Sequence, residues 1–256
     1  MLSVCMIAKD EQQFLRPALA SVMPIADEIV VGVDDRTTDL TGRIALEYGA
    51  SVHPFHWQDS FADARNHGLD RARGDWVLVI DPDECLLPEG GRRILTTLKA
   101  GVDPYIDAFS TLIVEEDMHG NVLSQAWSSS RLFRGAPDLR YMGRIHEEVR
   151  YLPDPPRTYS ERLEGGPHIV SFGSDPDLIG ARKKRQRDRR LLRMRLQDNR
   201  EDAVALCYLA LMARGDGNPR RAAVYATAAL NCGPRTLHDD RRAELEQLCT
   251  VPRETS

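Results

Sequence analysis

Two aspartates stand one residue apart directly after a run of apolar residues. Asp81 and Asp83 follow Trp76–Ile80, a continuous apolar stretch typical of a buried strand. Open parallel sheets bind ligands beyond the carboxyl ends of their strands, so both carboxylates point into that crevice. Carboxylate oxygens suit Mg²⁺ or Mn²⁺, whose shell is completed by water and substrate phosphates. The pattern therefore predicts a metal site for a phosphate-bearing substrate; the alternative is a turn before the helix that begins at Pro88.

Two further groups of polar residues are candidates for binding a nucleotide. Asp34 and Asp35 follow a second apolar run, Glu28–Val33, where a carboxylate can accept hydrogen bonds from a ribose hydroxyl or a base N–H. A simple turn explains this pair equally well. Arg65 lies in a helical segment and offers a planar fork to a phosphate or a base carbonyl; its alternative is a surface salt bridge.

Short apolar runs alternate with helical patterns through the first 100 residues. Strands are expected at 2–7, 28–33, 50–53 and 76–80, and helices at 11–22, 40–48, 61–73 and 88–100. Thr38 or Asp39 is the expected cap of the second helix. This alternation predicts an α/β fold with a mainly parallel, doubly wound sheet flanked by helices.

The pattern changes twice along the remaining chain. Strands expected at 108–115, 121–126, 131–134, 145–151 and 168–172, with a hairpin signal at 117–120, indicate an antiparallel or mixed half. Beyond residue 177 only helices are expected, at 178–197, 203–213, 219–231 and 239–249. The sequence thus predicts a catalytic domain at 1–175 and an α-helical appendage at 176–256.

Composition and charge narrow the function classes. The 256 residues carry a net charge of -5 and 42% hydrophobic residues, typical of a soluble globular protein. The segment Arg182–Arg200 has a local charge of +8, which leaves -13 for the rest. Nucleic acid is therefore not an expected partner, and the basic segment is interpreted as a linker helix facing an acidic body; a basic rim that attracts an anionic donor or acceptor stays open.

The sequence shows no pattern typical of a membrane-spanning segment, a disulfide framework or a zinc site. The longest apolar runs are too short to span a bilayer, so a cytoplasmic protein that does not span a membrane is expected. The five cysteines are widely spaced and lack a C-x-x-C pair, which argues against a disulfide framework and a zinc site.

Taken together, five segments in this order resemble the family 2 glycosyltransferases with a GT-A fold, especially a bacterial branch whose catalytic domain precedes tetratricopeptide-like helices. The resemblance covers about residues 1–175. The matching segments are Leu2–Glu11, Ala26–Asp39, Phe55–Asn66, Gly74–Glu84, and Arg131–Arg134 with Gly143–Glu147.

The resemblance implies an inverting transfer of a sugar from a nucleoside diphosphate sugar, UDP-linked, assisted by Mn²⁺ or Mg²⁺. It assigns the D-x-D metal pair to Asp81 and Asp83, with Asp81 also on the donor. The remaining donor-binding positions that it implies are Ala8 and Glu11 beside the nucleobase, Asp34 at the uracil or ribose, and Arg65 with Asn66 at the base and phosphate.

An inverting reaction also needs a general base on the acceptor side. Three candidates exist: Glu147, His146 and the acidic cluster at 115–117. Glu147 is favoured as the base and His146 as a third metal ligand or an acceptor contact, because the resemblance places this motif beside the donor site. The alternative is an ordinary strand whose alternate side chains face solvent.

Two positions depart from the family pattern. Arg36 begins Arg36–Asp39, where the family usually has Gly-Ser-Thr-Asp, and this cation is expected either to pair with Asp34 or Asp35 or to contact the donor. Ser171 stands where the family often carries a histidine, and His168, three residues away, faces the other side of its strand.

The helical tail resembles about one tetratricopeptide unit, which needs a neighbour to bury its face. It is expected to pack on the catalytic domain or on another subunit, as in a homo-oligomer. Acceptors in similar proteins are peptide side chains, sugars or lipid-linked glycans, and no residue discriminates among them. Two alternatives stay open: a nucleotidyltransferase of related fold, and a nucleotide-sugar-binding scaffold without catalysis.

Overall fold

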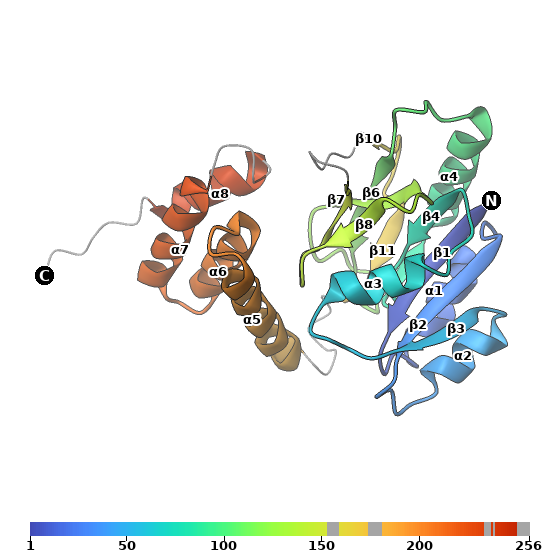
Figure 1. Ribbon diagram of the computed structural model, residues 1–256, viewed down its shortest axis with the longest axis horizontal. Helices are drawn as coiled ribbons and strands as arrows, with labels where there is room; N and C mark the ends of the chain where they lie inside the picture. Colours follow the sequence, from blue (N-terminus) through green and yellow to red (C-terminus); the bar gives the residue numbers. More distant parts are fainter. Residues whose placement is uncertain (153–158, 174–180, 233–236, 238, 250–256) are drawn as a thin grey trace, which may run out of the picture. The chain divides into compact units, whose positions relative to one another are not determined.

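A computed structural model describes residues 1–152, 159–173, 181–232, 237 and 239–249 (Figure 1). The chain divides into two compact units, one of residues 1–142 with 147–181 and one of 143–146 with 182–256. The domain boundary predicted near residue 175 lies outside the described residues. Each unit is described by itself.

A mixed sheet forms the centre of the first unit, in the order β3-β2-β1-β4-β7-β6-β11-β5, with β10 paired to β6. Strands β3, β2, β1 and β4 run parallel, whereas β7 runs antiparallel to both β4 and β6. A separate ribbon pairs β8 with β9. The strands are β1 Leu2–Ala8, β2 Glu28–Asp34, β3 Ser51–Phe55, β4 Trp76–Val79, β5 Glu84–Leu86, β6 Ala108–Glu115, β7 Trp127–Arg134, β8 Leu139–Met142, β9 Glu148–Tyr151, β10 Ser160–Arg162 and β11 Ile169–Ser171.

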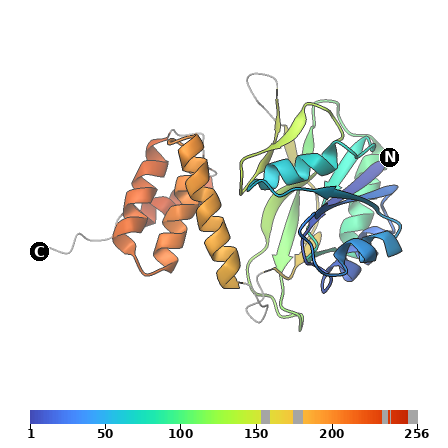
Figure 2. The same ribbon diagram turned by 60° about the horizontal axis from the view of Figure 1, so that its bottom comes forward.

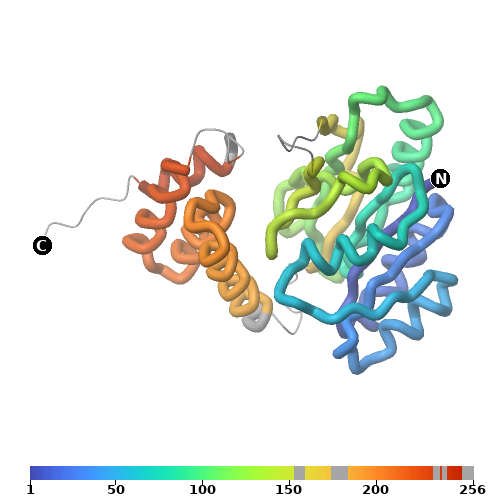
Figure 3. The backbone as a smooth tube through the Cα atoms, in the orientation of Figure 1, coloured from blue at the N-terminus to red at the C-terminus, as the bar shows by residue number. Residues whose placement is uncertain are grey.

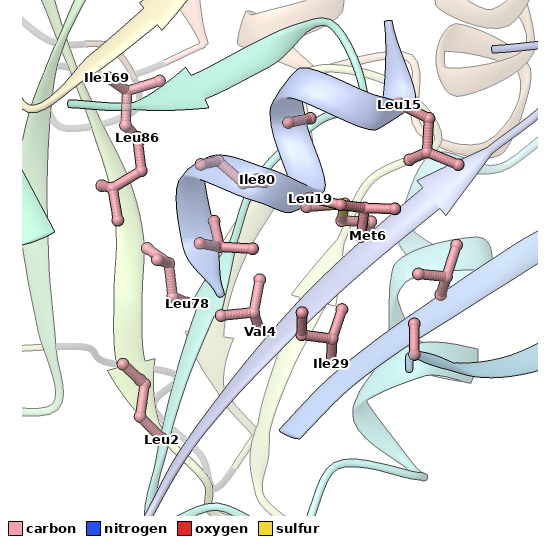
Figure 4. Close-up of a cluster of buried hydrophobic side chains, with 14 of the residues drawn as sticks. Leu2, Val4, Met6, Leu15, Leu19, Ile29, Leu78, Ile80, Leu86 and Ile169 are labelled. Atoms are coloured by element: carbon pink, nitrogen blue, oxygen red, sulfur yellow. The ribbon is translucent and has the colours of Figure 1, made fainter. Parts of the chain in front are cut away.

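Helices cover both faces of this sheet because alternate strand residues point to opposite sides. Even-numbered residues of β1 pack with α1, α2 and α4 in the larger core, whereas Cys5 packs with α3 in a second core. Figure 4 shows Val4, Met6, Leu15 and Leu19 in the larger core. The helices are α1 Leu15–Val22, α2 Thr41–Glu47, α3 Phe61–Leu69 and α4 Pro88–Ala100. The predicted α/β, GT-A-like architecture is confirmed.

Several predicted elements were displaced. Residues 121–126 are not a strand: they are largely exposed, and the pairing partner of β6 is β7, which begins at Trp127. The first helix begins at Leu15 rather than residue 11, because residues 12–14 form a turn after Asp10, whose φ is +55°. The third helix ends at Leu69 rather than residue 73. Strands β5, β8 and β10 were not predicted.

Four helices form the second unit, as Figures 2 and 3 show in orange and red. They are α5 Ala181–Asp198, α6 Ala203–Gly215, α7 Pro219–Asn231 and α8 Asp239–Cys249. Asp202 and Asn218 cap α6 and α7 by accepting hydrogen bonds from Ala205 N (2.9 Å) and Arg221 N (3.0 Å). A core rich in alanine lets α6, α7 and α8 approach closely. Across the described residues, every helix is too short or too polar to cross a lipid bilayer.

The close approach of α4 to β11 gives a first testable prediction. A Cβ added at Gly90 would lie 2.5 Å from the His168 carbonyl oxygen and 2.8 Å from His168 Cα. Since both are backbone atoms, we expect Gly90→Ala to lower the free energy of unfolding by about 1–3 kcal/mol through overpacking. Gly42→Ala in α2 is the matched control, because its Cβ would meet nothing within 4 Å. Urea unfolding of both variants checks this: equal stabilities would contradict the described packing.

Candidate functional site

The carboxyl ends of β2, β1 and β4 meet at one edge of the sheet (Figure 1). Ala8, at the end of β1, pairs with Val33, so Asp34 lies beside it on β2. On the other side of β1, Ile80 N donates to Cys5 O, and Asp81 follows directly. The strand order therefore brings the predicted residues Ala8, Asp34 and Asp81 to the same edge of the sheet, the edge at which open parallel sheets bind ligands.

Asp81 lies between two buried arginines. Arg65 Nη1 of α3 is 2.8 Å from Asp81 Oδ1, and Arg131 Nη2 of β7 is 3.3 Å from Asp81 Oδ2. Both arginine side chains are only 9% exposed, whereas the Asp81 side chain keeps 26%. Burial alone would raise the pKa of Asp81, but the two arginines outweigh it and hold that pKa well below its usual range. Asp81 is thus an ionised and partly exposed carboxylate.

Glu84 completes the buried cluster. Its Oε1 lies 2.7 Å from Arg131 Nη2, and its Oε2 accepts a hydrogen bond from Asp81 N at 2.9 Å. Burial raises the pKa of Glu84 to about 7 although Arg131 opposes it. Neither Glu84 nor Arg131 was predicted as a site residue. The signal that could have identified Arg131 is a charged residue directly before the apolar pair Leu132 and Phe133 of β7.

Arg65 also links Asp81 to Glu147. Its Nε lies 2.6 Å from Glu147 Oε1, and its guanidinium carbon lies 5.5 Å from the centre of the Tyr141 ring. The structure therefore brings three predicted residues, Arg65, Asp81 and Glu147, into one chain of contacts. Because the same guanidinium contacts both carboxylates, Arg65 fixes the distance between them.

Asn66, predicted beside the nucleotide, holds a strand in place. Its side-chain amide donates to Tyr141 O (2.9 Å) and accepts from Tyr141 N (2.9 Å). These paired hydrogen bonds attach α3 to β8. Asn66 thereby positions Tyr141 beneath Arg65.

Arg36 pairs with Asp34, which is one of the two outcomes predicted for this cation. Its Nε and Nη2 donate to the two Asp34 carboxylate oxygens at 3.0 and 2.9 Å. Burial would raise the pKa of Asp34, but these hydrogen bonds lower it. Asp34 is therefore a buried carboxylate covered by a half-exposed guanidinium.

The loops after β1 and β2 are tied together. Glu11 N donates to Thr41 Oγ1 at 2.7 Å, and Asp10 Oδ1 accepts from Thr38 N at 2.7 Å. The predicted cap, Thr38 or Asp39, is wrong: Leu40 is the N-cap residue of α2 and makes no capping side-chain hydrogen bond, although Asp39 Oδ1 accepts from Thr41 N, the first helical residue, at 2.8 Å. Glu11 thus lies on an ordered rim next to the crevice.

His146 groups with the helical unit. Its ring stacks on the Tyr208 ring with centroids 3.3 Å apart, at a backbone φ of +50°. Within the described part of the chain, no three His, Cys, Asp or Glu side chains converge on a position that could hold a metal ion. Asp81 and Asp83 belong to the first unit and His146 to the second, so the predicted set of these three metal ligands stays a prediction.

The buried position of His146 predicts a pH dependence of stability. Burial, with Arg195 and Arg241 nearby, lowers its pKa from 6.5 to about 3. Between these pH values the unfolded chain binds a proton that the folded chain does not, so stability falls as the pH falls, by at most about 1.4 kcal/mol per pH unit. His146→Phe keeps an aromatic ring but cannot titrate. We expect this variant to lose that part of the slope in urea unfolding from pH 7 to pH 5.

The control for this prediction is His119→Gln, at an exposed position in the turn between β6 and β7. That variant is expected to keep the slope of the parent protein. A His146→Phe slope equal to that of the parent would contradict the assignment of the proton to His146.

Two carboxylates remain as metal-binding candidates. Asp81 and Asp83 are both partly exposed beyond β4, and two carboxylates suffice for Mg²⁺ or Mn²⁺ when substrate phosphates complete the shell. The donor atoms therefore fit such a cation, which would share Asp81 with Arg65 and Arg131.

The second departure from the family pattern is Ser171, where the family often carries a histidine. Ser171 is buried on β11 and pairs with Glu84 of β5. His168 is also buried, and its Nδ1 accepts from Leu112 N at 3.0 Å while Nε2 contacts Glu164 O at 3.1 Å. Both ring nitrogens thus contact the backbone, so His168 does not substitute for a histidine at position 171.

The chain is similar in sequence to known proteins. A TPR repeat-containing protein of Synechococcus elongatus is 37% identical over 211 residues, covering 80% of this chain and 50% of its own length. The chain thus spans half the length of that relative.

Two solved structures are similar in fold. S. aureus TarS 1–349 in complex with UDP-GlcNAc has a TM-score of 0.51 at 15% identity, covering 97% of this chain and 87% of its own. The mannosyltransferase PcManGT from Pyrobaculum calidifontis, in complex with GDP-Man and Mn²⁺, has a TM-score of 0.52 at 17% identity, covering 97% and 84%.

The sequence profile of glycosyl transferase family 2 matches residues 3–134, which include β1 to β4, Asp81 and Arg131. The match spans just over half of the chain and contains the four neighbouring parallel strands β1 to β4. This chain belongs to glycosyl transferase family 2.

Proposed function

We propose that this protein is an inverting glycosyltransferase that moves a sugar from a nucleoside diphosphate sugar, UDP-linked, to an acceptor with the help of a divalent metal. Family membership supports glycosyl transfer, and the complexes of TarS with UDP-GlcNAc and of PcManGT with GDP-Man and Mn²⁺ support this donor class. The observation that carries the proposal is the Arg65 guanidinium, which links Asp81 at the end of β4 to Glu147.

The nucleotide is proposed to bind over the ends of β1 and β2. Ala8 and Glu11 border the base, and the Asp34 carboxylate accepts hydrogen bonds from the uracil or the ribose. Both Asp34 oxygens already accept from Arg36, so the donor has to share them with that side chain or displace it. Asn66 contributes by holding Tyr141 and Arg65 in place.

The diphosphate is proposed to lie at Asp81 and Asp83, the two residues that would hold Mg²⁺ or Mn²⁺. When bound, the cation stabilises the negative charge that develops on the leaving diphosphate. Arg65 and Arg131 balance the carboxylates of Asp81, Glu84 and Glu147, so the positive charge that attracts the diphosphate would come from the cation. His146 is left out of this set because its ring stacks on Tyr208.

Glu147 is proposed as the general base. Inversion requires an acceptor hydroxyl in line with the breaking anomeric bond, and a carboxylate takes its proton as the new bond forms. Arg65 holds Glu147 in a fixed position relative to Asp81. Fixing the base relative to the leaving group is what an in-line displacement needs.

The test is a panel of UDP- and GDP-linked sugars incubated with the full chain and Mn²⁺ or Mg²⁺, with slow donor hydrolysis as the readout. We expect release of free sugar and nucleoside diphosphate, and loss of that release in EDTA. Absence of both binding and hydrolysis for every donor would contradict the proposal. Cleavage to a nucleoside monophosphate would favour a nucleotidyltransferase, and binding without turnover under any acceptor would favour a scaffold.

A further inference from the structure

A groove on the helical unit is lined mainly by arginines. A hollow of about 390 Å³ is bordered by Arg185, Gln186, Arg189, Arg190, Arg193 and Asp216. A second hollow of about 130 Å³ shares Arg189, Arg193 and Asp216 and continues over Leu209, Met212 and Tyr225. We call these two adjoining hollows the arginine groove.

The described residues that line the arginine groove include more basic than acidic side chains. Asp216 is the only acid among the described residues that line it, and Arg185 (2.6 Å) and Arg189 both pair with this carboxylate. Arg193 borders both hollows, is exposed, and forms no hydrogen bond or ion pair with any residue that the structure describes. The groove therefore presents guanidinium groups that suit carboxylates or phosphates.

The spacing of these arginines favours an extended chain of alternating side chains. Arg185, Arg189 and Arg193 stand four residues apart on α5 and so share one face. Each step along the helix is about 6 Å. In an extended peptide, every second side chain lies on the same side at intervals of about 6.6 Å. Carboxylates at alternate positions of such a peptide can thus meet successive arginines.

The floor of the smaller hollow suits the same ligand. Leu209, Met212 and Ala213 supply apolar surface between Arg189 on α5 and Arg221 on α7. A peptide that alternates acidic and apolar residues would place its carboxylates on the arginines and an apolar side chain on this floor. The groove thus offers separate contacts for both kinds of side chain.

Nucleic acid is less well matched. Single strands bind to proteins through aromatic rings on which bases stack. Tyr225 is the aromatic residue that lines the groove, and the Arg221 guanidinium already lies 5.7 Å from its ring centre.

We propose that the arginine groove binds an extended acidic peptide segment of a partner protein, with carboxylates at alternate positions. The inference does not depend on the donor site or on catalysis. It gives the helical unit a recognition role.

The test uses the full chain and a fluorescent peptide of alternating glutamate and leucine, with binding followed by fluorescence anisotropy at low and physiological salt. We expect saturable binding that Arg193→Gln weakens about tenfold, because a charge-assisted contact is lost. Arg200→Gln is the matched control: it removes the same charge from the same basic segment but does not line the groove. This control is expected to bind like the parent protein.

Two further probes separate the alternatives. A peptide with the same glutamates in one block is expected to bind more weakly, since only alternate spacing fits the arginines. Equal losses in Arg193→Gln and Arg200→Gln would overturn the proposal in favour of diffuse charge attraction, and a single-stranded oligonucleotide that binds more tightly than the peptide would overturn it in favour of nucleic acid. Far-UV circular dichroism of each variant confirms that the helices are retained.

Discussion

Asp83→Asn is expected to reduce metal-dependent hydrolysis of the nucleotide-sugar donor by about 10²-fold or more, because the amide removes one of the two carboxylates proposed to hold the cation. Of the two aspartates, Asp83 is the better one to replace. Asp81 forms ion pairs with Arg65 and Arg131, so its replacement would also disturb buried charges. The measurement is the initial rate of nucleoside diphosphate release at saturating Mn²⁺, with far-UV circular dichroism to confirm folding.

The control for this prediction is Asp103→Asn, which removes the same charge from an exposed position before β6. It is expected to retain the parent rate. If Asp83→Asn also retained the parent rate while EDTA still abolished hydrolysis, the cation would have to be bound by other residues. If EDTA had no effect on the parent protein, the metal itself would be excluded from the reaction.

The elements that could be predicted are those whose signals are local. β4 is a continuous apolar run because it lies between β1 and β7 and is buried on both faces. α4 was predicted with its observed bounds because Pro88 begins it and Gly101, with φ of +87°, ends it. β5 and β10 are three residues long, too short for a periodic pattern to identify them.

The candidate site likewise contains residues that a local pattern predicts and residues that it does not. Asp81 was predicted from its own strand, because a carboxylate directly after a buried run is visible in the sequence. Arg131 lies fifty positions away, and its contact with Asp81 depends on the antiparallel pairing of Leu78 with Leu132. Glu84 lies on β5, which pairs with β11, and it contacts the same arginine. No pattern within a short window encodes such a contact, so the compensating charges of the site required the structure.

His146 and Glu147 are neighbours in one motif, but they belong to different compact units. The motif Arg144–Glu147 places a histidine and a glutamate side by side, and the prediction put both at the donor site. In the structure Glu147 contacts Arg65, whereas the adjacent His146 turns to Tyr208. The reversal requires a positive φ at residue 146, which a non-glycine residue rarely adopts and which the sequence does not announce.

Arg131→Met is expected to have the largest effect on stability. The substitution leaves Glu84, which is 3% exposed, without its cation and removes one of the two partners of Asp81. Breaking a buried ion pair from one side typically destabilises a protein by about 3–5 kcal/mol, because the remaining charge stays buried. Urea unfolding of the full chain measures this. Arg140→Met, which removes a partly exposed arginine paired with Asp70, is the control and is expected to cost less than about 1 kcal/mol.

The double variant Arg131→Met with Glu84→Gln distinguishes loss of packing from an uncompensated charge. If the buried carboxylate causes the loss, neutralising it in the same chain should restore a large part of the stability, since the remaining glutamine can still accept the hydrogen bond from Asp81 N. A double variant as unstable as Arg131→Met alone would instead assign the effect to lost packing between β7 and the end of β4. With restored stability, the same protein can then be assayed for donor binding, which tests whether Arg131 supports the diphosphate site or only the fold beneath it.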